Sequence, residues 1–271
     1  EYTGTTTSGA DITKNSDSGE YILYVKATDS LGNENKAQSG IFRFDNTAPE
    51  VTFGTDGDST PRKEHSTTVN VSNDGLSNIV TRKYLWSTQT SGINEGSFAS
   101  VSDTFASGGT VRGSGYNESY YLWVYVADAA GNIVVTKTNN SFNFDNTLPK
   151  ITFTPEQNTK PAKSQSTKVS VSDTNLDESS LKYLWTQNDT KPDASQITNP
   201  LKNNSDVTLN GETGNRYLWV LALDTANNQV IEGAGPFLLD NTPPSIELDY
   251  DGTTNSITVN VKAQDTGAGM P

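Results

Sequence analysis

An internal repeat constrains the fold of this chain more than any other feature. The string FDNTAPEVTF at residues 44–53 returns as FDNTLPKITF at 144–153 and, with changes, as LDNTPPSIEL at 239–248. The aspartates of the three copies lie 100 and 95 residues apart. A string that recurs at this spacing predicts tandem domains, with the string at the joint between one domain and the next.

Three further blocks recur in a constant order between the copies of this string, which strengthens the prediction of tandem domains. They are YILYVKATDSLGN, YYLWVYVADAAGN and RYLWVLALDTANN at 21–33, 120–132 and 216–228; RKYLWST and LKYLWTQ at 82–88 and 181–187; and TTVNVSND, TKVSVSDT and ITVNVKAQD at 67–74, 167–174 and 257–265.

The repeated blocks alternate with a period of two and are rich in β-branched and aromatic residues, which predicts strands. In the block at 120–132, Leu122, Val124 and Val126 fall on one face, and the residues between them fall on the other. Short strands with turn signals, in units of about 100 residues, predict antiparallel β-sandwiches. We therefore expect an all-β chain of tandem immunoglobulin-like sandwiches.

The repeat also predicts the domain boundaries. We expect the C-terminal part of a sandwich at 1–48, whole sandwiches at 49–148 and 149–243, and the N-terminal part of a sandwich at 244–271. On this alignment the head lacks its first strands and the tail holds only two opening strands. The chain is therefore expected to be a segment of a longer array.

The composition agrees with several small domains and excludes some partners. Only 32% of residues are hydrophobic and the mean hydropathy is -0.59, which suits small β domains with much surface per residue. The net charge of -13 disfavours nucleic acid, whose phosphates would be repelled. There is no cysteine, which excludes disulfides and thiolate metal sites. No apolar run is long enough to insert into a membrane, and the chain opens without a signal peptide.

The motifs D-x-x-G-N and F-x-x-D-N-T-x-P resemble those of bacterial immunoglobulin-like (Big-type) tandem repeats of cell-surface and secreted proteins. The matches are residues 29–33 with 45–49, 128–132 with 145–149 and, with TANN in place of the Gly-Asn turn, 224–228 with 240–244. The resemblance covers nearly the whole chain. It implies immunoglobulin-like sandwiches that serve as stalks, adhesin shafts, surface-layer (S-layer) modules or spacers of polysaccharide-degrading enzymes.

The sequence argues against catalysis. The chain has one histidine, His65, in the polar stretch STPRKEHS, and we expect it to be a solvated loop residue. A single histidine cannot supply a Ser-His-Asp triad in each repeat. We find no phosphate-binding glycine loop, zinc spacing or pair of carboxylates tied to a pocket.

Acidic residues that are distant in sequence are expected to converge at each joint. In a sandwich, the linker and the loops after the second and sixth strands lie at the same end. Carboxylate and amide oxygens are the ligands that calcium prefers, so calcium (Ca2+) is the candidate cofactor. The candidate ligands are Asp45, Asn46, Asp74, Asp128 and Asn132 at the first joint, Asp145, Asn146, Asp173 (or Asp177) and Asp224 at the second, and Asp240, Asn241 and Asp265 at the third.

Two features can order the joints without a metal. Asp and Asn accept backbone N–H bonds in turns, which requires no cation. The proline that follows Asn-Thr-x also restricts the linker by itself, because it fixes φ. Some bacterial immunoglobulin-like shafts stiffen their joints with calcium, and the resemblance implies the same for this chain.

The aromatic residues divide into two groups. Trp86 and Trp185, with Tyr84 and Tyr183, lie on the YLW strand and are expected in the core. The aromatic residues of the later strand alternate with inward aliphatic residues and are expected on the outer face. There they form an exposed strip that stacks on sugar rings, or they are covered by long loops or a neighbouring domain. The candidate ligand-binding residues are Tyr121, Trp123, Tyr125 and Trp219, with Tyr217 beside them.

These observations lead to one expected function and one alternative. We expect a non-catalytic structural segment of a bacterial cell-surface or secreted protein, acting outside the cell as an adhesin stalk or spacer. The alternative is a glycan-binding accessory module of a polysaccharide-active or surface-layer protein. The expected partners are neighbouring repeats and a host-surface or cell-wall glycan or protein. Lys-Asn isopeptide bonds stabilise some proteins that the chain resembles. The sequence does not locate such a bond in this chain.

Overall fold

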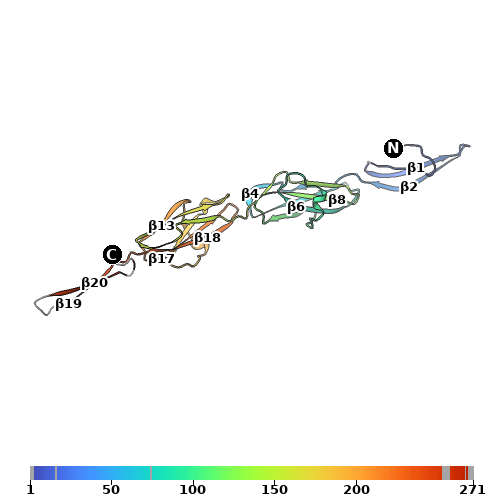
Figure 1. The fold of residues 1–271 in the computed structure, drawn as a ribbon. Helices are drawn as coiled ribbons and strands as arrows, with labels where there is room; N and C mark the ends of the chain where they lie inside the picture. Colours follow the sequence, from blue (N-terminus) through green and yellow to red (C-terminus); the bar gives the residue numbers. More distant parts are fainter. Residues whose placement is uncertain (1–2, 16, 74, 252–256, 266, 268–271) are drawn as a thin grey trace. The chain divides into compact units, whose positions relative to one another are not determined.

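The computed structural model describes residues 3–15, 17–73, 75–251, 257–265 and 267 (Figure 1). The chain divides into two compact units. Unit 1 comprises Glu1–Thr60 and Glu64–Phe144, and unit 2 comprises Pro61–Lys63 and Asp145–Pro271. The described residues contain strands and three single-turn 3-10 helices and no α-helix, so the prediction of an all-β chain is confirmed.

Unit 1 contains an antiparallel hairpin and a two-sheet sandwich. The hairpin pairs β1 (Gly19–Thr28) with β2 (Glu34–Phe44). One sheet of the sandwich has the order β3 (Glu50–Phe53), β5 (Glu64–Ser72), β7 (Gly109–Ser114). The other has the order β4 (Asp58–Arg62), β10 (Phe142–Phe144), β8 (Ser119–Asp128), β6 (Ile79–Ser87), with β9 (Ile133–Lys137) also paired to β8. The helix η1 (Glu95–Phe98) lies between β6 and β7.

Unit 2 contains a second sandwich of similar strand order, with β15 as an additional edge strand, and a second hairpin. Its first sheet has the order β11 (Lys150–Thr154), β13 (Ser164–Ser172), β16 (Ser205–Asn210). Its second sheet has the order β12 (Asn158–Ala162), β18 (Gln229–Leu239), β17 (Gly214–Leu223), β14 (Lys182–Thr186), β15 (Asn199–Pro200). The helices η2 (Glu178–Ser180) and η3 (Ala194–Gln196) lie in its loops, and β19 (Ser245–Asp251) pairs with β20 (Thr258–Gln264).

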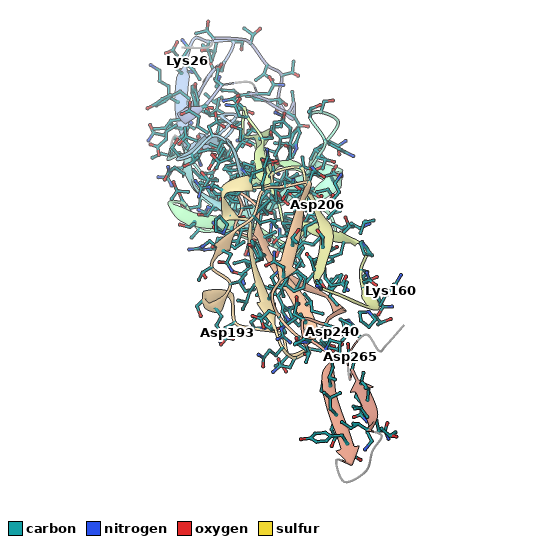
Figure 2. All side chains as sticks on the ribbon, turned by 90° about the vertical axis from the view of Figure 1, so that its left-hand side faces the viewer. Lys26, Lys160, Asp193, Asp206, Asp240 and Asp265 are labelled. Carbon is teal, nitrogen blue, oxygen red and sulfur yellow. The ribbon has the colours of Figure 1, made fainter. Side chains whose placement is uncertain are left out.

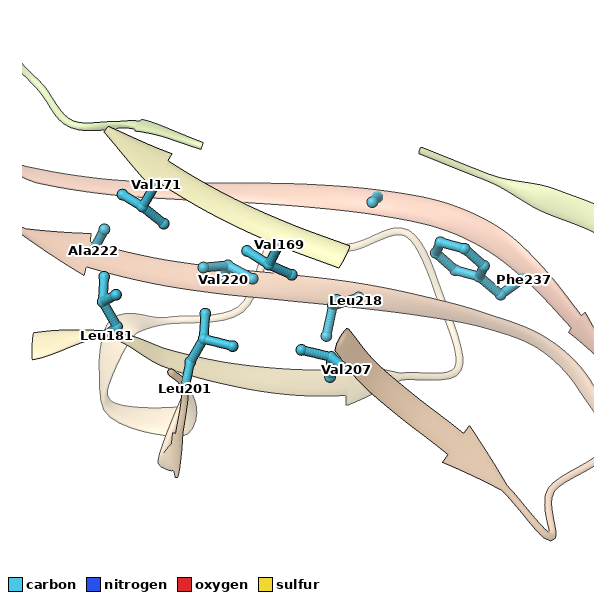
Figure 3. Packing of buried hydrophobic residues seen from close by; sticks show 10 residues of the cluster. Val169, Val171, Leu181, Leu201, Val207, Leu218, Val220, Ala222 and Phe237 are labelled. Carbon is cyan, nitrogen blue, oxygen red and sulfur yellow. The ribbon is translucent and has the colours of Figure 1, made fainter. Parts of the chain in front are cut away.

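The core of each sandwich lies between its two sheets and is built from the alternating positions of the repeated blocks. In unit 1, Val69 and Val111 of one sheet pack with Leu122 and Val124 of the other. In unit 2 the same layer contains Val169, Val171, Val207, Leu218, Val220 and Phe237 (Figure 3). Burying one such side chain stabilises the fold by about 1.5–3 kcal/mol, so a layer of this size is sufficient to hold two short sheets together.

The tryptophan of the YLW strand fills the core, as predicted. Trp86 is buried in the unit 1 cluster, with its ring edge-on to Phe142 and Phe144 at 5.3 Å. Trp185 packs against the unit 2 cluster and lies 5.4 Å from Phe237, but it is only half-buried. The facing sheet contributes to this difference, because Gly113 of β7 has no side chain and allows the Trp86 ring to approach its backbone closely.

Of the two alternatives for the aromatic residues of the outer face, an exposed strip or coverage by long loops, the second holds for both tryptophans. Trp123 and Trp219 expose only 7% and 8% of their surface. In unit 1 the segment between β6 and β7 covers this face: Trp123 Nε1 donates to Gln89 O at 3.0 Å, and Phe98 stacks on Tyr125. In unit 2, Ile197 after η3 packs on Trp219 with Leu221 and Ile231. Long loops therefore cover the aromatic rings of this face.

The prediction for His65 is also wrong. This residue is not in a solvated loop but in β5, where it is 6% exposed. Its ring packs against Phe142 and Phe144, with centroid distances of 5.3 and 4.9 Å. The polar neighbours of His65 in the sequence misled the prediction, because in a strand every second residue points inward and Glu64 and Ser66 face away.

Among the described residues, we find no helix with the length and apolarity required to cross a membrane.

The packing of unit 1 predicts that Leu122→Ala is strongly destabilising. Leu122 is fully buried at the centre of the core, and a Leu→Ala change at such a position costs about 2–5 kcal/mol because it leaves a cavity. Urea unfolding followed by tryptophan fluorescence measures the loss. Val80→Ala is the matched control, because Val80 is 61% exposed and its truncation is expected to change stability by less than about 0.5 kcal/mol. Equal effects of the two variants would contradict this description of the core.

Candidate functional site at the Asp-Asn-Thr segments

The recurring string begins with an apolar residue, an aspartate, an asparagine and a threonine, and these four side chains have different surroundings. We call residues 45–47, 145–147 and 240–242 the Asp-Asn-Thr segments. The residue before the second segment, Phe144, is fully buried in the core of unit 1, and the residue before the third, Leu239, is fully buried in unit 2. The apolar first position of the string is therefore an anchor that fixes the end of the last strand.

The aspartate and the threonine of each segment form a tight turn. The carboxylate Oδ1 accepts a hydrogen bond from the backbone N–H two residues later, at 3.0 Å for Asp45, 3.0 Å for Asp145 and 3.1 Å for Asp240. An Asp side chain that bonds its own backbone in this way mimics a turn and orders the residues before the proline. Turn chemistry therefore explains one of the two carboxylate oxygens.

A second motif, the D-x-x-G-N block, forms a turn at the C-terminal end of β1, β8 and β17. We call residues 29–33, 128–132 and 224–228 the Asp-Asn turns. In the third of them, Asp224 Oδ1 accepts from the Asn228 N–H at 2.7 Å and Asp224 Oδ2 from the Asn228 amide at 2.7 Å. The corresponding bonds of Asp128 with Asn132 are 2.8 and 2.9 Å, and those of Asp29 with Asn33 are 2.8 and 2.8 Å.

The departure of the third Asp-Asn turn from the repeat pattern does not change its conformation. The glycines at 32 and 131 have φ of 88° and 92°, in the left-handed region. In the third turn this position is Asn227, with φ of 64°. Asparagine tolerates this region better than most residues because its side chain bonds locally, so TANN can replace a Gly-Asn turn.

The asparagine at the end of each Asp-Asn turn also bonds the Asp-Asn-Thr segment. Asn132 Nδ2 donates to Asp45 O at 3.0 Å, and Asn228 Nδ2 donates to Asp145 O at 2.9 Å. The two donors of one amide are thus divided between the carboxylate of its own turn and the backbone carbonyl of the linker. This shared amide explains why the two motifs recur together.

The linker carboxylate reaches the loop that follows β5 in unit 1 and β13 in unit 2. Asp45 Oδ2 accepts from Ser77 Oγ at 2.5 Å, and Asp145 Oδ2 accepts from Asn175 Nδ2 at 2.7 Å. The prediction that this loop, the Asp-Asn turn and the linker lie at one end of the sandwich agrees with these bonds. The donor in the loop differs between the repeats, so it could not be read from the repeat pattern.

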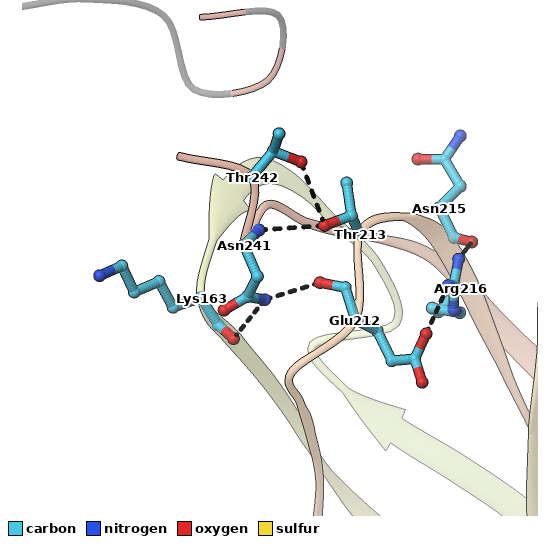
Figure 4. Close-up of polar contacts among 7 residues, drawn as sticks. All are labelled: Lys163, Glu212, Thr213, Asn215, Arg216, Asn241 and Thr242. Carbon is cyan, nitrogen blue, oxygen red and sulfur yellow. Dashed lines mark hydrogen bonds and ion pairs between the residues drawn. The ribbon is translucent and has the colours of Figure 1, made fainter. Parts of the chain in front are cut away.

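The asparagine of each segment bonds the elements that come before it. Asn241 Nδ2 donates to Lys163 O at 3.1 Å and to Glu212 O at 2.6 Å, while its N–H donates to Thr213 Oγ1 at 3.2 Å (Figure 4). Asn46 Nδ2 donates to Asp17 O at 3.1 Å, and Asn146 Nδ2 donates to Lys63 O at 3.3 Å. These amide groups hold turns through their Nδ2 donors.

Hydrogen bonding stabilises the ionised form of two turn aspartates. Burial raises the pKa of Asp128, but hydrogen bonds from the side chain and backbone of Asn132 and from the Ala130 N–H together hold this pKa below its usual range. Bonds from the side chain and backbone of Asn33 lower the pKa of Asp29. These two turns therefore favour a carboxylate over a neutral acid.

One group of carboxylates is arranged as a cation site requires. Oxygen atoms of Asp145, Asp173 and Asp224 lie within 4.8 Å of one another, and Asp145 and Asp224 are buried. This cluster can hold a metal ion. Its three hard oxygen donors fit Ca2+, although each carboxylate already accepts hydrogen bonds. Asp177, the alternative to Asp173, caps η2 through the Ser179 N–H instead.

The other predicted ligands are placed differently. Asp74 lies outside the described residues. Asn73 occupies the position equivalent to Asp173 in the strand register, and its Oδ1 is buried without a hydrogen-bond partner. Asp240 and Asp265 lie at the base of the β19–β20 hairpin (Figure 2), where Gly267 donates its N–H to Asp265 at 2.8 Å and a Cβ at position 267 would meet the Asp240 carboxylate.

The two tyrosines among the candidate ligand-binding residues are half-buried and in contact with neighbouring side chains. Lys137 Nζ lies 4.0 Å from the Tyr121 ring centroid, and the Tyr125 hydroxyl is 3.2 Å from Glu95 Oε1. Together with the buried tryptophans, they do not form the exposed strip on which a sugar ring would stack.

Comparison with known proteins gives matches in structure but not in sequence. No family model and no curated protein matches the chain. Solved structures that match include the fibronectin(III)-like modules of Clostridium thermocellum CbhA (12% identity, 70% of this chain and 94% of that one, TM-score 0.29). Others are the chicken CNTN1 FN1-FN3 domains (14%, 78% and 76%, 0.25) and a Corynebacterium diphtheriae protein described as membrane anchored (11%, 92% and 69%, 0.25). With such scores, the sandwich assignment rests on the sheets of this chain.

The shared amide predicts that Asn228→Ala destabilises unit 2. The change removes two hydrogen bonds and leaves Asp145 O and the buried Asp224 carboxylate without that donor, which costs about 1–3 kcal/mol. Urea unfolding measures the effect. Asn215→Ala is the control, because the Asn215 side chain is exposed and its truncation is expected to be nearly neutral. Wild-type stability of the Asn228 variant would mean that the shared amide contributes nothing.

Proposed function

We propose that this chain is a non-catalytic spacer segment of an extracellular bacterial protein, belonging to the bacterial immunoglobulin-like (Big-type) tandem repeats. Its task is to hold other parts of the parent protein at a distance from their attachment point. The observation that supports the proposal is the repeated pairing of an Asp-Asn-Thr segment with an Asp-Asn turn, because this pairing orders the linkers.

The linkers have the properties that a spacer needs. Pro49 and Pro149 are buried next to the segments, and proline fixes the backbone φ there. The Asp carbonyl and carboxylate are bonded by the loops that follow, as with Asp45 to Asn132 and Ser77. A linker whose aspartate is bonded through both its carbonyl and its carboxylate has less freedom than an unbonded linker, as a spacer requires.

The glycan-binding alternative loses its main support. It depends on aromatic rings that are open to solvent on one face of the sheet. Trp123 and Trp219 are buried beneath loops, and their indole N–H groups are bonded to Gln89 O and Thr186 Oγ1. The stalk or adhesive shaft is therefore the function we retain, with neighbouring repeats as its first partners and a cell-surface location.

Small-angle X-ray scattering tests the spacer proposal. A chain whose joints are held straight is expected to give a pair-distance distribution with a long tail and a maximum dimension far above that of a globule of 271 residues. The variant Asn132→Ala, which frees Asp45 O, is expected to shorten the average dimension by allowing bending. A compact distribution for the natural chain would refute the proposal.

We further propose that Ca2+ binds at Asp145, Asp173 and Asp224. When bound, the ion would neutralise carboxylates that otherwise repel one another and would join the linker to two loops. In this proposal Asp145 supplies the linker ligand, Asp173 the ligand after β13 and Asp224 the ligand of the Asp-Asn turn. The first joint has Asn73 where the second has Asp173, so a neutral amide occupies this ligand position there.

The calcium proposal predicts a stabilisation of unit 2 by the metal alone. At a Ca2+ concentration 100 times the dissociation constant, the free energy of unfolding rises by about 2.7 kcal/mol. Thermal unfolding in CaCl2 and in chelator measures this change. Asp173→Asn is expected to abolish it, whereas Asp206→Asn, at an exposed position of β16, is expected to retain it. No response of the natural chain to calcium would leave turn chemistry as the complete explanation of the cluster.

A further inference from the structure

The turn after β16 contains the one asparagine–glycine pair of the sequence. Asn210 is the last residue of β16, and Gly211 follows it. Both residues are exposed, and in the described part of the chain neither the Asn210 side chain nor the Gly211 N–H makes a hydrogen bond. Gly211 has φ of 75°, and a Cβ added to it would meet nothing within 4 Å. The side-chain amide and the next backbone nitrogen are therefore adjacent, open to water and unrestrained.

This arrangement permits a reaction between the side chain and the backbone. The nitrogen of Gly211 attacks Asn210 Cγ, the new N–Cγ bond forms, and the Cγ–Nδ2 bond breaks. The proton of the attacking nitrogen leaves with the amide group as ammonia, and a five-membered cyclic imide remains. Water then opens the imide at one of its two carbonyls, which gives aspartate or isoaspartate. Glycine favours the first step because no side chain shields its nitrogen.

The equivalent turn of unit 1 has a similar backbone but cannot undergo this reaction. Ser114 pairs with Glu64 as Asn210 pairs with Ser164, so Ser114 and Asn210 are equivalent positions. Gly115, which follows Ser114, has φ of 77° and is exposed like Gly211. A serine has no side-chain carbonyl carbon for the nitrogen to attack. The chain therefore contains its own unreactive counterpart of the turn.

A second comparison within the chain shows what would protect such a pair. Among the described residues, Asp56 also stands before a glycine, Gly57. The Asp56 carboxylate accepts hydrogen bonds from the Asn139 N–H and side-chain amide, and Gly57 lies directly against Asn140. Ring closure requires the side chain to turn toward the next nitrogen, and these contacts oppose that turn. Asn210 has no contacts of this kind in the described residues.

The residues that follow Gly211 hold the third Asp-Asn-Thr segment. Asn241 Nδ2 donates to Glu212 O at 2.6 Å, and the Asn241 N–H donates to Thr213 Oγ1 at 3.2 Å (Figure 4). Isoaspartate carries the main chain through Cγ, so it adds one carbon atom to the backbone between β16 and Glu212. Because the pairing of β16 with β13 fixes the start of the turn, the added atom must displace Glu212 and Thr213.

We propose that Asn210 is a site of spontaneous deamidation, and that the isoaspartate product loosens the hold of Glu212 and Thr213 on Asn241. The reaction consumes only water, so it does not depend on the proposed spacer function. Both products carry a carboxylate where the natural chain has an amide, which changes the formal net charge from -13 to -14 (-13 - 1). The third joint of the chain would then change with the age of the molecule.

The first test follows the whole chain during incubation in a mildly alkaline buffer. We expect ion-exchange chromatography to resolve a growing species with one more negative charge, and intact mass to show the exchange of an NH group for oxygen. Peptide mapping with electron-transfer fragmentation is expected to place the change at residue 210 and to identify isoaspartate. Asn210→Ser, which recreates the Ser114–Gly115 pair of unit 1, is the matched control and is expected to give no such species. An unchanged residue 210 in the incubated natural chain would overturn the assignment.

The second test measures the effect on the joint by amide hydrogen exchange. In the purified isoaspartate fraction, the Asn241 N–H is expected to exchange faster than in the fresh chain, because its acceptor Thr213 Oγ1 is displaced. The variant Asn210→Asp adds the charge without the extra backbone atom and is expected to keep the natural exchange rate. Equal exchange of the Asn241 N–H in the fresh and isoaspartate chains would refute the proposed coupling to the joint.

Discussion

The joints of this chain depend on one side-chain amide that is shared between two motifs. In unit 2, Asn228 gives one of its two donors to the Asp224 carboxylate and the other to the carbonyl of Asp145. The first bond closes a turn, and the second attaches the linker to that turn. Because both acceptors are buried or nearly so, breaking either bond leaves a polar group without its partner, at a cost of about 1–3 kcal/mol. The same bonds, made by Asn132 with Asp128 and Asp45, occur in unit 1.

This shared amide gives a physical reason for the recurring string. The apolar residue before each aspartate enters the core of the preceding strands, as Phe144 does. The aspartate bonds the loops that follow, and the asparagine bonds turns that come before, as Asn241 does with Lys163 and Glu212. The threonine closes the turn through its N–H, and the proline limits φ. Each position of the string makes a different contact, so a substitution at one of these positions removes a contact that the others do not replace.

Much of this organisation could be predicted from the sequence, because the repeat supplies several copies of one pattern. Period-two alternation placed Leu122 and Val124 in the core, and the likeness of the YLW strand to the tryptophan-bearing strand of immunoglobulin folds placed Trp86 with them. The convergence of Asp145, Asp173 and Asp224 also followed from strand order alone. The local turn at Asp224 was the alternative interpretation, and its bonds to Asn228 are present beside the cluster.

The remaining features depend on contacts that a linear pattern does not encode. His65 has polar neighbours in the sequence, and only the pairing of β5 with β7 and the packing of β10 bury it. Trp219 alternates with inward residues, but Ile197 from a long loop covers it. The asparagines of the Asp-Asn-Thr segments have the chemistry of metal ligands, and their actual direction is set by carbonyls such as Lys163 O. In each example a distant segment determines the surroundings of the residue.

The shared amide predicts that the Asp-Asn turn and the linker open together, which means that both lose their hydrogen bonds in one local unfolding event. Amide hydrogen exchange measures this directly, because the Thr147 N–H is bonded to Asp145 Oδ1 and the Asn228 N–H to Asp224 Oδ1. If the shared amide couples the two, both N–H groups exchange through one opening event and give the same opening free energy. Rapid exchange of the Thr147 N–H while the Asn228 N–H stays protected would show that the linker moves independently and would contradict the claim.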